Sequence, residues 1–135
     1  MQYCTITITT TVDEKQTTAK RHGNMQLSAT SAVLVYREES AQVSISLFPE
    51  YGEIVRVGDY TLKLPLKTGE VLQGKIGIGD SHGAVEVDTH KIAFSTSENS
   101  LLAQLQYTLI FGKERQVMRL RIHAKADKGR ITNEN

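Results

Sequence analysis

Apolar and polar side chains alternate with a period of two residues along most of the chain, and this feature limits the possible folds most strongly. Near the N-terminus, Cys4, Ile6 and Ile8 alternate with threonines, and the same pattern runs through residues 101–111. Every second side chain of a β-strand points to the same face, so each such segment has one face to bury. No segment keeps the apolar spacing of an amphipathic helix for more than two turns. The sequence therefore predicts an all-β protein.

Segments of this kind recur at short intervals and are separated by turn residues. We expect strands at residues 4–12, 16–27, 32–36, 43–47, 53–57, 60–64, 71–78, 84–88, 89–95, 101–111 and 118–125. Such a series is typical of a β-sandwich or an up-and-down barrel. Long strands favour closure, because an exposed strand edge invites aggregation. We therefore predict a single antiparallel up-and-down barrel of about eight to ten strands, with an interior that is filled by side chains or holds one small ligand.

Two glycine-containing turns carry more specific predictions. Gly58 and Asp59 separate two strand segments. Glycine at the first position of a two-residue loop is typical of a type II′ turn, which needs a positive φ at that position. Residues 79–83, Gly-Asp-Ser-His-Gly, are all common in loops, so we expect a longer loop there.

Length and composition are those of one soluble globular domain. The chain has 135 residues, of which 39% are hydrophobic and 23% are charged. We assign residues 1–125 to the barrel and expect a polar, disordered tail at residues 126–135. Cys4 is the single cysteine, so the fold depends on no internal disulfide. No apolar run reaches the ~18 residues of a membrane helix and no signal peptide is recognised, so we expect a cytoplasmic protein without a membrane partner.

Several short motifs are similar to those of a known family. They are residues 79–92 (GDSHGAVEVDTHKI), residues 105–109 (LQYTL), Gly23 followed by residues 33–39 (VLVYREE), and Arg56-Val57-Gly58. Together they resemble the YwiB-like family of small bacterial proteins of unknown function, over almost the whole chain. The loop at residues 80–83 departs from the Thr-Pro-Tyr-Gly loop of that family. The resemblance implies a calycin-like, lipocalin-related β-barrel and no settled activity.

Four aromatic side chains are candidates for lining a ligand site. Tyr36, Tyr60, Phe94 and Tyr107 come from different expected strands. Inside a barrel, a phenol supplies apolar area and one polar group, although such rings also serve simply to fill a core. By analogy with the fold, our leading hypothesis is a non-catalytic protein that binds a small, partly apolar molecule in the barrel interior.

A second hypothesis is a metal-dependent enzyme. Glu86, Asp88 and His90 share one strand face by their spacing, and Asp80 or His82 could complete a metal site. Neighbours on such a face lie ~6.6–7 Å apart, so three of them do not easily reach one metal ion. We therefore favour a solvated outer face without a bound metal or other cofactor, and an enzyme is the less favoured class.

A third hypothesis is an interaction module that uses the last strand. Residues 1–110 contain 9 basic and 12 acidic side chains, whereas residues 111–135 contain 7 basic and 3 acidic ones. The face concerned consists of Arg119, Arg121, His123 and Lys125. Such a row of basic side chains suits phosphates or an acidic protein. No aromatic side chain accompanies the row for base stacking. Glu86 and Asp88 could also neutralise its positive charge across strands. Nucleic acid is therefore not the favoured partner, and the sequence predicts no oligomeric state.

Overall fold

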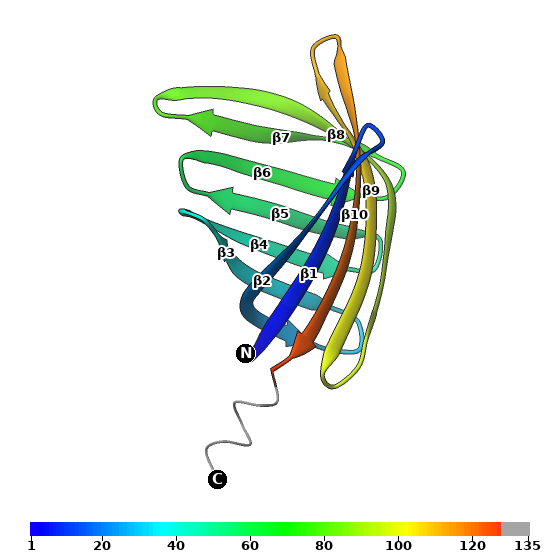
Figure 1. Cartoon of the computed structure of the whole chain (residues 1–135). Helices are drawn as coiled ribbons and strands as arrows, with labels where there is room; N and C mark the ends of the chain where they lie inside the picture. Colours follow the sequence, from blue (N-terminus) through cyan, green and yellow to red (C-terminus); the bar gives the residue numbers. More distant parts are fainter. Residues whose placement is uncertain (128–135) are drawn as a thin grey trace.

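The computed structural model describes residues 1–127, which form one closed barrel of antiparallel strands (Figure 1). The strands are β1 (Gln2–Val12), β2 (Lys15–Leu27), β3 (Ala32–Glu38), β4 (Ala41–Phe48), β5 (Tyr51–Val57), β6 (Tyr60–Lys67), β7 (Val71–Ile78), β8 (Ser81–Thr96), β9 (Ser100–Phe111) and β10 (Glu114–Ala126). Each strand pairs with the next one along the chain, and β1 closes the barrel by pairing with β10. The predicted all-β, up-and-down barrel is confirmed. Over the described residues, no helix is long and apolar enough to cross a membrane.

The alternating apolar residues face the interior, as predicted. On β9, Leu101, Leu105 and Leu109 are buried, whereas Leu102 and Gln104 between them are exposed. Large side chains less than 2% exposed fill much of the barrel: Ile6, Met25, Leu34, Ile45, Leu47, Leu64, Leu66, Val85, Val87, Leu101, Leu105 and Ile122. Burial of this apolar surface is the main favourable contribution to folding.

Cys4 belongs to this core as well. Its side chain is buried among apolar neighbours on β1. Burial raises the pKa of the Cys4 thiol, so the reactive thiolate form is disfavoured. The cysteine is therefore a packing residue.

Strand β8 joins two segments that the sequence pattern separates. The register against β9 shifts between Thr89 and Lys91, so His90 is the extra residue of a β-bulge. Because the bulge adds one residue, the alternation of inward-facing and outward-facing residues shifts at this point, while β8 continues as one strand. The strand also starts at Ser81, so the predicted long loop at residues 79–83 is wrong. The turn consists of residues 79–80, and Gly79 adopts a φ of +59° that suits glycine.

Gly58 has a different role from the one predicted. Its φ is not among the positive values found in the described residues, so the type II′ turn is wrong. A Cβ atom at Gly58 would lie 2.6 Å from the Cβ atom of Ala41 at the start of β4. The position therefore needs glycine because β4 approaches closely.

The turns between strands alternate between the two ends of the barrel. We call one of them the arginine end, because Arg56 lies there; it carries the turns at residues 13–14, 39–40, 58–59, 79–80 and 112–113. The β2–β3 ladder covers only Gly23–Leu27, while the β1–β2 ladder continues as far as Val12 and Lys15. The β1–β2 and β9–β10 hairpins thus extend past their neighbours at this end (Figure 1).

At the opposite end, β10 runs to Ala126, whose backbone N–H donates a hydrogen bond to the Asn99 carbonyl oxygen at 2.8 Å. Asp127 follows and donates its backbone N–H to the Tyr3 carbonyl oxygen at 2.9 Å. Residues 128–135 of the expected tail lie outside the described residues.

Candidate functional site

Three of the four aromatic candidates lie near the arginine end, on the inner face of the wall. Tyr36 follows Ala32 and Leu34 in the inward-facing set of β3, and Tyr107 follows Leu105 in that of β9. Tyr60 stands at the rim, at the start of β6. Phe94 is a separate case, because it packs against the core from the part of β8 that leads to the opposite end. The structure therefore brings Tyr36, Tyr60 and Tyr107 to one end and leaves Phe94 apart.

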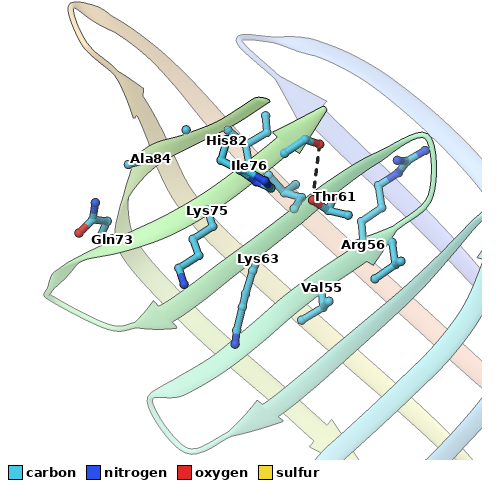
Figure 2. A pocket seen from close by; sticks show the side chains of 13 residues that line it. Val55, Arg56, Thr61, Lys63, Gln73, Lys75, Ile76, His82 and Ala84 are labelled. Atoms are coloured by element: carbon cyan, nitrogen blue, oxygen red, sulfur yellow. Dashed lines mark hydrogen bonds between the residues drawn. The ribbon is translucent and has the colours of Figure 1, made fainter. Parts of the chain in front are cut away.

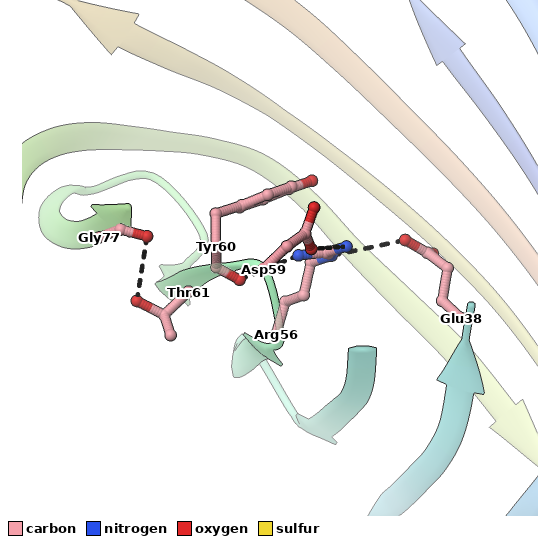
Figure 3. Close-up of polar contacts among 6 residues, drawn as sticks. All are labelled: Glu38, Arg56, Asp59, Tyr60, Thr61 and Gly77. Atoms are coloured by element: carbon pink, nitrogen blue, oxygen red, sulfur yellow. Dashed lines mark hydrogen bonds and ion pairs between the residues drawn. The ribbon is translucent and has the colours of Figure 1, made fainter. Parts of the chain in front are cut away.

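Arg56 is the centre of a polar cluster at this end (Figure 3). Its side chain is 12% exposed, and its Nη2 atom lies 2.9 Å from Oδ1 of Asp59. Its Nη1 atom donates a hydrogen bond to the Tyr60 carbonyl oxygen at 2.9 Å, and its Nε atom lies 3.5 Å from Oε1 of Glu38. The guanidinium carbon also lies 3.7 Å from the centroid of the Tyr60 ring. Arg56 thus ties the β5–β6 turn to the end of β3.

The cluster stabilises its charged groups in their ionised forms. Burial disfavours the charged guanidinium, but the hydrogen bonds to Asp59 and Glu38 and the charges of Tyr60 and Asp59 outweigh it and raise the pKa of Arg56. The hydrogen bond from Arg56 also lowers the pKa of the Asp59 carboxyl. Asp59 is therefore ionised and engaged by Arg56 at neutral pH, and Glu38 contacts the same guanidinium.

Two buried phenols next to this cluster have no hydrogen-bond partner. Tyr36 is 6% exposed and Tyr107 is 3% exposed. Within the described part of the chain, neither hydroxyl forms a hydrogen bond, and Thr68 Oγ1 is the one fully enclosed side-chain oxygen or nitrogen without a partner. The two tyrosine hydroxyls therefore border open space. Because each hydroxyl keeps some accessible surface, water or a bound molecule can reach it and supply the partner that the protein does not.

Arg21 adds a positive charge to the same region. It belongs to the inward-facing set of β2 that includes Gly23 and Met25, and its charge acts on the Tyr36 phenol. Its side chain forms no ion pair or hydrogen bond with any described residue. Arg21 is therefore a free donor near the Tyr36 hydroxyl.

Both phenols keep their protons at neutral pH. Burial is the main cause that raises the pKa of Tyr36 to about 12, and the Glu38 charge adds to it while Arg21 opposes it. Burial also raises the pKa of Tyr107, with a further contribution from Tyr36. The two hydroxyls are thus hydrogen-bond donors, and the influence of Tyr36 on Tyr107 shows that the two side chains lie near each other.

An alkaline titration checks this arrangement. A raised pKa means that the phenolate forms at a higher pH, so two of the five tyrosines should stay protonated beyond pH ~10, the value for an unperturbed tyrosine. Ultraviolet absorbance of the phenolate measures the ionised fraction, and circular dichroism monitors folding in the same samples. The late phase should disappear in a Tyr36→Phe/Tyr107→Phe variant. A single phase for all five tyrosines in a folded barrel would contradict the assignment.

Partly buried apolar side chains also lie on the inner face of strands at this end. Leu62, Phe111, Met118 and Leu120 are half-buried and pack against the core. They come from β6, β9 and β10, which bound the arginine end. The region therefore combines three free donors with apolar walls, the composition of a site for a small molecule with a polar head.

A hollow of about 650 Å³ lies on the outer side of β5–β8 and reaches Arg56 (Figure 2). Lys63 and Lys75 are directly opposite each other on β6 and β7 and point the same way. Gly77 leaves room there, since a Cβ atom would lie 2.7 Å from Thr61 Oγ1. Nζ of Lys63 lies 3.9 Å from Oε2 of Glu53, and both side chains are largely exposed. This is a solvated surface, outside the barrel.

The Glu86, Asp88 and His90 row also lies on the outer face. Nδ1 of His90 lies 4.0 Å from Oδ1 of Asp88, and its Nε2 atom lies 2.8 Å from Oγ1 of Thr108, so both ring nitrogens face protein groups. Among residues 1–127, no three His, Cys, Asp or Glu side chains come together as a metal site would need. No observation in this region favours the metal-dependent enzyme.

Sequence reasoning missed the two arginines. A signal was present, because Arg56 continues the inward-facing alternation of Ile54, and Arg21 that of Gly23 and Met25. A charged residue in an apolar series indicates either a paired charge or a polar site. Arg56 enters the predictions from the sequence only as part of the motif Arg56-Val57-Gly58.

Comparisons with known proteins agree with this barrel. The family model described as "Domain of unknown function (DUF1934)" matches residues 2–123. Among solved structures, the "Crystal structure of ywiB protein from Bacillus subtilis" is similar, with a TM-score of 0.79, 13% identity, and 93% of this chain and 92% of that chain covered. At this identity the match shows a shared fold alone, and a comparison with curated proteins found no match. The resemblance indicated by the short motifs is confirmed, and the chain belongs to the DUF1934 family.

Proposed function

We propose that this protein is a non-catalytic binding protein that takes a small, partly apolar molecule into the arginine end of the barrel. The observation that carries the proposal is the pair of hydroxyls on the buried residues Tyr36 and Tyr107, which border open space without a protein partner. A bound molecule would supply the missing acceptor.

The hydrogen-bond donors at this end indicate which polar group the ligand carries. Tyr36 and Tyr107 keep their protons at neutral pH, which is far below their raised pKa values, so both can donate, and Arg21 has only donors. Glu38 and Asp59 are engaged by Arg56 and so do not neutralise Arg21 directly. Three hydrogen-bond donors that have no partner in the protein suit a carboxylate, sulfonate or phosphate group.

The apolar side chains at this end indicate that the remaining part of the ligand is apolar. Leu62, Met118 and Leu120 offer apolar surface at the same end of the barrel, and the deeper interior is filled by fully buried side chains. The ligand therefore reaches into one end and does not cross the barrel. An apolar body gains affinity from each buried CH₂ group, by roughly 0.8 kcal/mol.

The proposal includes two expectations from the sequence, a lipocalin-related barrel and a cytoplasmic location. A ligand held in one end of an up-and-down barrel is consistent with the lipocalin-related kinship that the family resemblance implies. A cytoplasmic location remains an expectation, supported by a single, buried Cys4 that needs no oxidising compartment.

Titration with 1-anilinonaphthalene-8-sulfonate tests the proposal, since this probe joins a sulfonate to an apolar body and fluoresces when it is desolvated. We expect saturable binding of one probe per chain. Removing one donor with Tyr107→Phe should weaken binding about tenfold or more, because a hydrogen bond to a charged group contributes ~1.5–3 kcal/mol. The same variant without the probe should be as stable as the parent, since the hydroxyl has no protein partner to lose.

Tyr51→Phe is the matched control. Tyr51 is exposed, stacks on Phe48 with ring centroids 4.8 Å apart, and lies beside the turn at residues 49–50 of the opposite end. This variant should bind the probe as the parent does. Equal binding by Tyr51→Phe, Tyr107→Phe and Tyr36→Phe would show that the probe does not use the two hydroxyls and would rule the proposed site out.

A further inference from the structure

The outer surface of four neighbouring strands carries basic and polar side chains. We call it the basic face; it consists of the outward-facing residues Gln104 and Gln106 of β9, Arg119, Arg121, His123 and Lys125 of β10, Thr5, Thr7, Thr9 and Thr11 of β1, and Lys20 and His22 of β2. The strand order β9-β10-β1-β2 makes this surface continuous. Arg119, Arg121, His123 and Lys125 are all exposed.

Carboxylates are missing from this part of the sequence. Strands β1, β2 and β9 contain no Asp or Glu, and β10 contains only Glu114, its first residue. The suggested neutralisation by Glu86 and Asp88 is wrong, because β9 lies between β8 and β10. In residues 1–127, the side chains of Arg119, Arg121 and Lys125 form no ion pair. The positive charge on this face is therefore not compensated locally.

Uncharged hydrogen-bonding groups flank each arginine. Arg121 lies between Thr9 on β1 and Gln104 on β9, and Arg119 lies between Thr11 and Gln106. A shallow hollow of about 280 Å³ is lined by these residues. Guanidinium, hydroxyl and amide groups are those that proteins direct at phosphate oxygens. Alternate residues of a strand lie ~6.6–7 Å apart, so the row offers a regular series of contacts along β10.

We infer that the basic face binds the phosphate backbone of nucleic acid. The net charge of the whole chain is only +1, so attraction must come from this local field. A regular row of cations flanked by hydroxyl and amide groups fits a chain of evenly spaced phosphates better than an acidic protein, whose carboxylates are not evenly spaced. The β10 row holds no aromatic side chain, so it contacts phosphates without reading bases. This site is distinct from the arginine end, because its residues face outward.

Fluorescence anisotropy with a labelled oligothymidine, and with a duplex of equal length, tests the inference. The variant Arg119→Gln/Arg121→Gln removes two charges from the basic face. The matched control, Lys63→Gln/Lys75→Gln, removes two charges from the outer hollow of β5–β8 and reaches the same net charge. Thermal unfolding shows whether both variants fold as the parent does.

We expect the parent to bind at least one of the two oligonucleotides with a Kd of roughly 10⁻⁴–10⁻⁶ M at physiological salt. The arginine variant should bind about tenfold or more weakly, and the slope of log K against log salt should decrease in size by ~1.4 for the single strand. The lysine variant should stay within about threefold of the parent, well under 1.4 kcal/mol. Equal losses in the two variants, no binding by the parent at low salt, or tighter binding of polyglutamate or anionic vesicles than of either oligonucleotide would each overturn the inference.

Discussion

Replacing Leu105 with alanine should lower the free energy of unfolding by about 2–5 kcal/mol. Leu105 is 1% exposed in the middle of β9, and its cross-strand partners are Ile92 on β8 and Leu120 on β10. Truncation removes buried apolar surface and leaves a cavity, because the paired strands on both sides hold the wall in place. Urea denaturation followed by circular dichroism measures the change.

Leu102→Ala is the control on the same strand. Leu102 points outward and is half exposed, so this change should stay within about 0.5 kcal/mol. The two leucines thus differ in the face of β9 that they occupy. A smaller loss for Leu105→Ala than for Leu102→Ala would mean that the inner and outer faces are assigned the wrong way round.

Gly23→Ala should destabilise the barrel by about 3 kcal/mol or more, since overpacking costs ~1–3 kcal/mol even where side chains can adjust. A Cβ atom at this position would collide with the Val35 carbonyl oxygen and would lie 2.8 Å from the Cβ atom of Tyr36. Both neighbours belong to β3, and the β2–β3 ladder is short, extending only from Gly23 to Leu27. Backbone atoms cannot move aside as a flexible side chain can, so the ladder must open.

Gly83→Ala provides the comparison for Gly23→Ala. Its Cβ atom would meet only Cγ2 of Ile76, at 3.5 Å, which is ordinary van der Waals contact. Gly83 is also a strand residue, so both changes remove the same backbone freedom. Denaturant midpoints should show a large loss for Gly23→Ala and little change for Gly83→Ala. Similar midpoints for the two variants would show that β3 does not approach Gly23 as closely as described.

The fold could be predicted from the sequence because its main signal is local. Alternation along each strand, as in residues 101–109, identifies which side chains face inward without knowledge of their partners. The turn residues between strands then indicate consecutive antiparallel pairing. Where local patterns have two physical explanations, prediction failed. Glycine at position 58 suits a left-handed backbone or a close approach, and only the position of Ala41 decides between them.

The candidate site could be predicted only in part for a related reason. Tyr36 and Tyr107 are visible as inward-facing aromatics, but β3 and β9 are far apart in sequence and meet at one end only after the barrel closes. Whether a hydroxyl finds a partner depends on side chains from several strands at once. The roles of Arg21 and Arg56 depend on the same closure.

Nuclear Overhauser effects between the chain and bound anilinonaphthalene sulfonate show whether a ligand binds inside the arginine end. We expect contacts from the probe to the methyl groups of Met118 and Leu120, together with shifts of the Tyr36 and Tyr107 ring signals. Contacts confined to outward-facing groups, such as the methyl groups of Val55 in the outer hollow of β5–β8, would contradict a ligand site inside the arginine end.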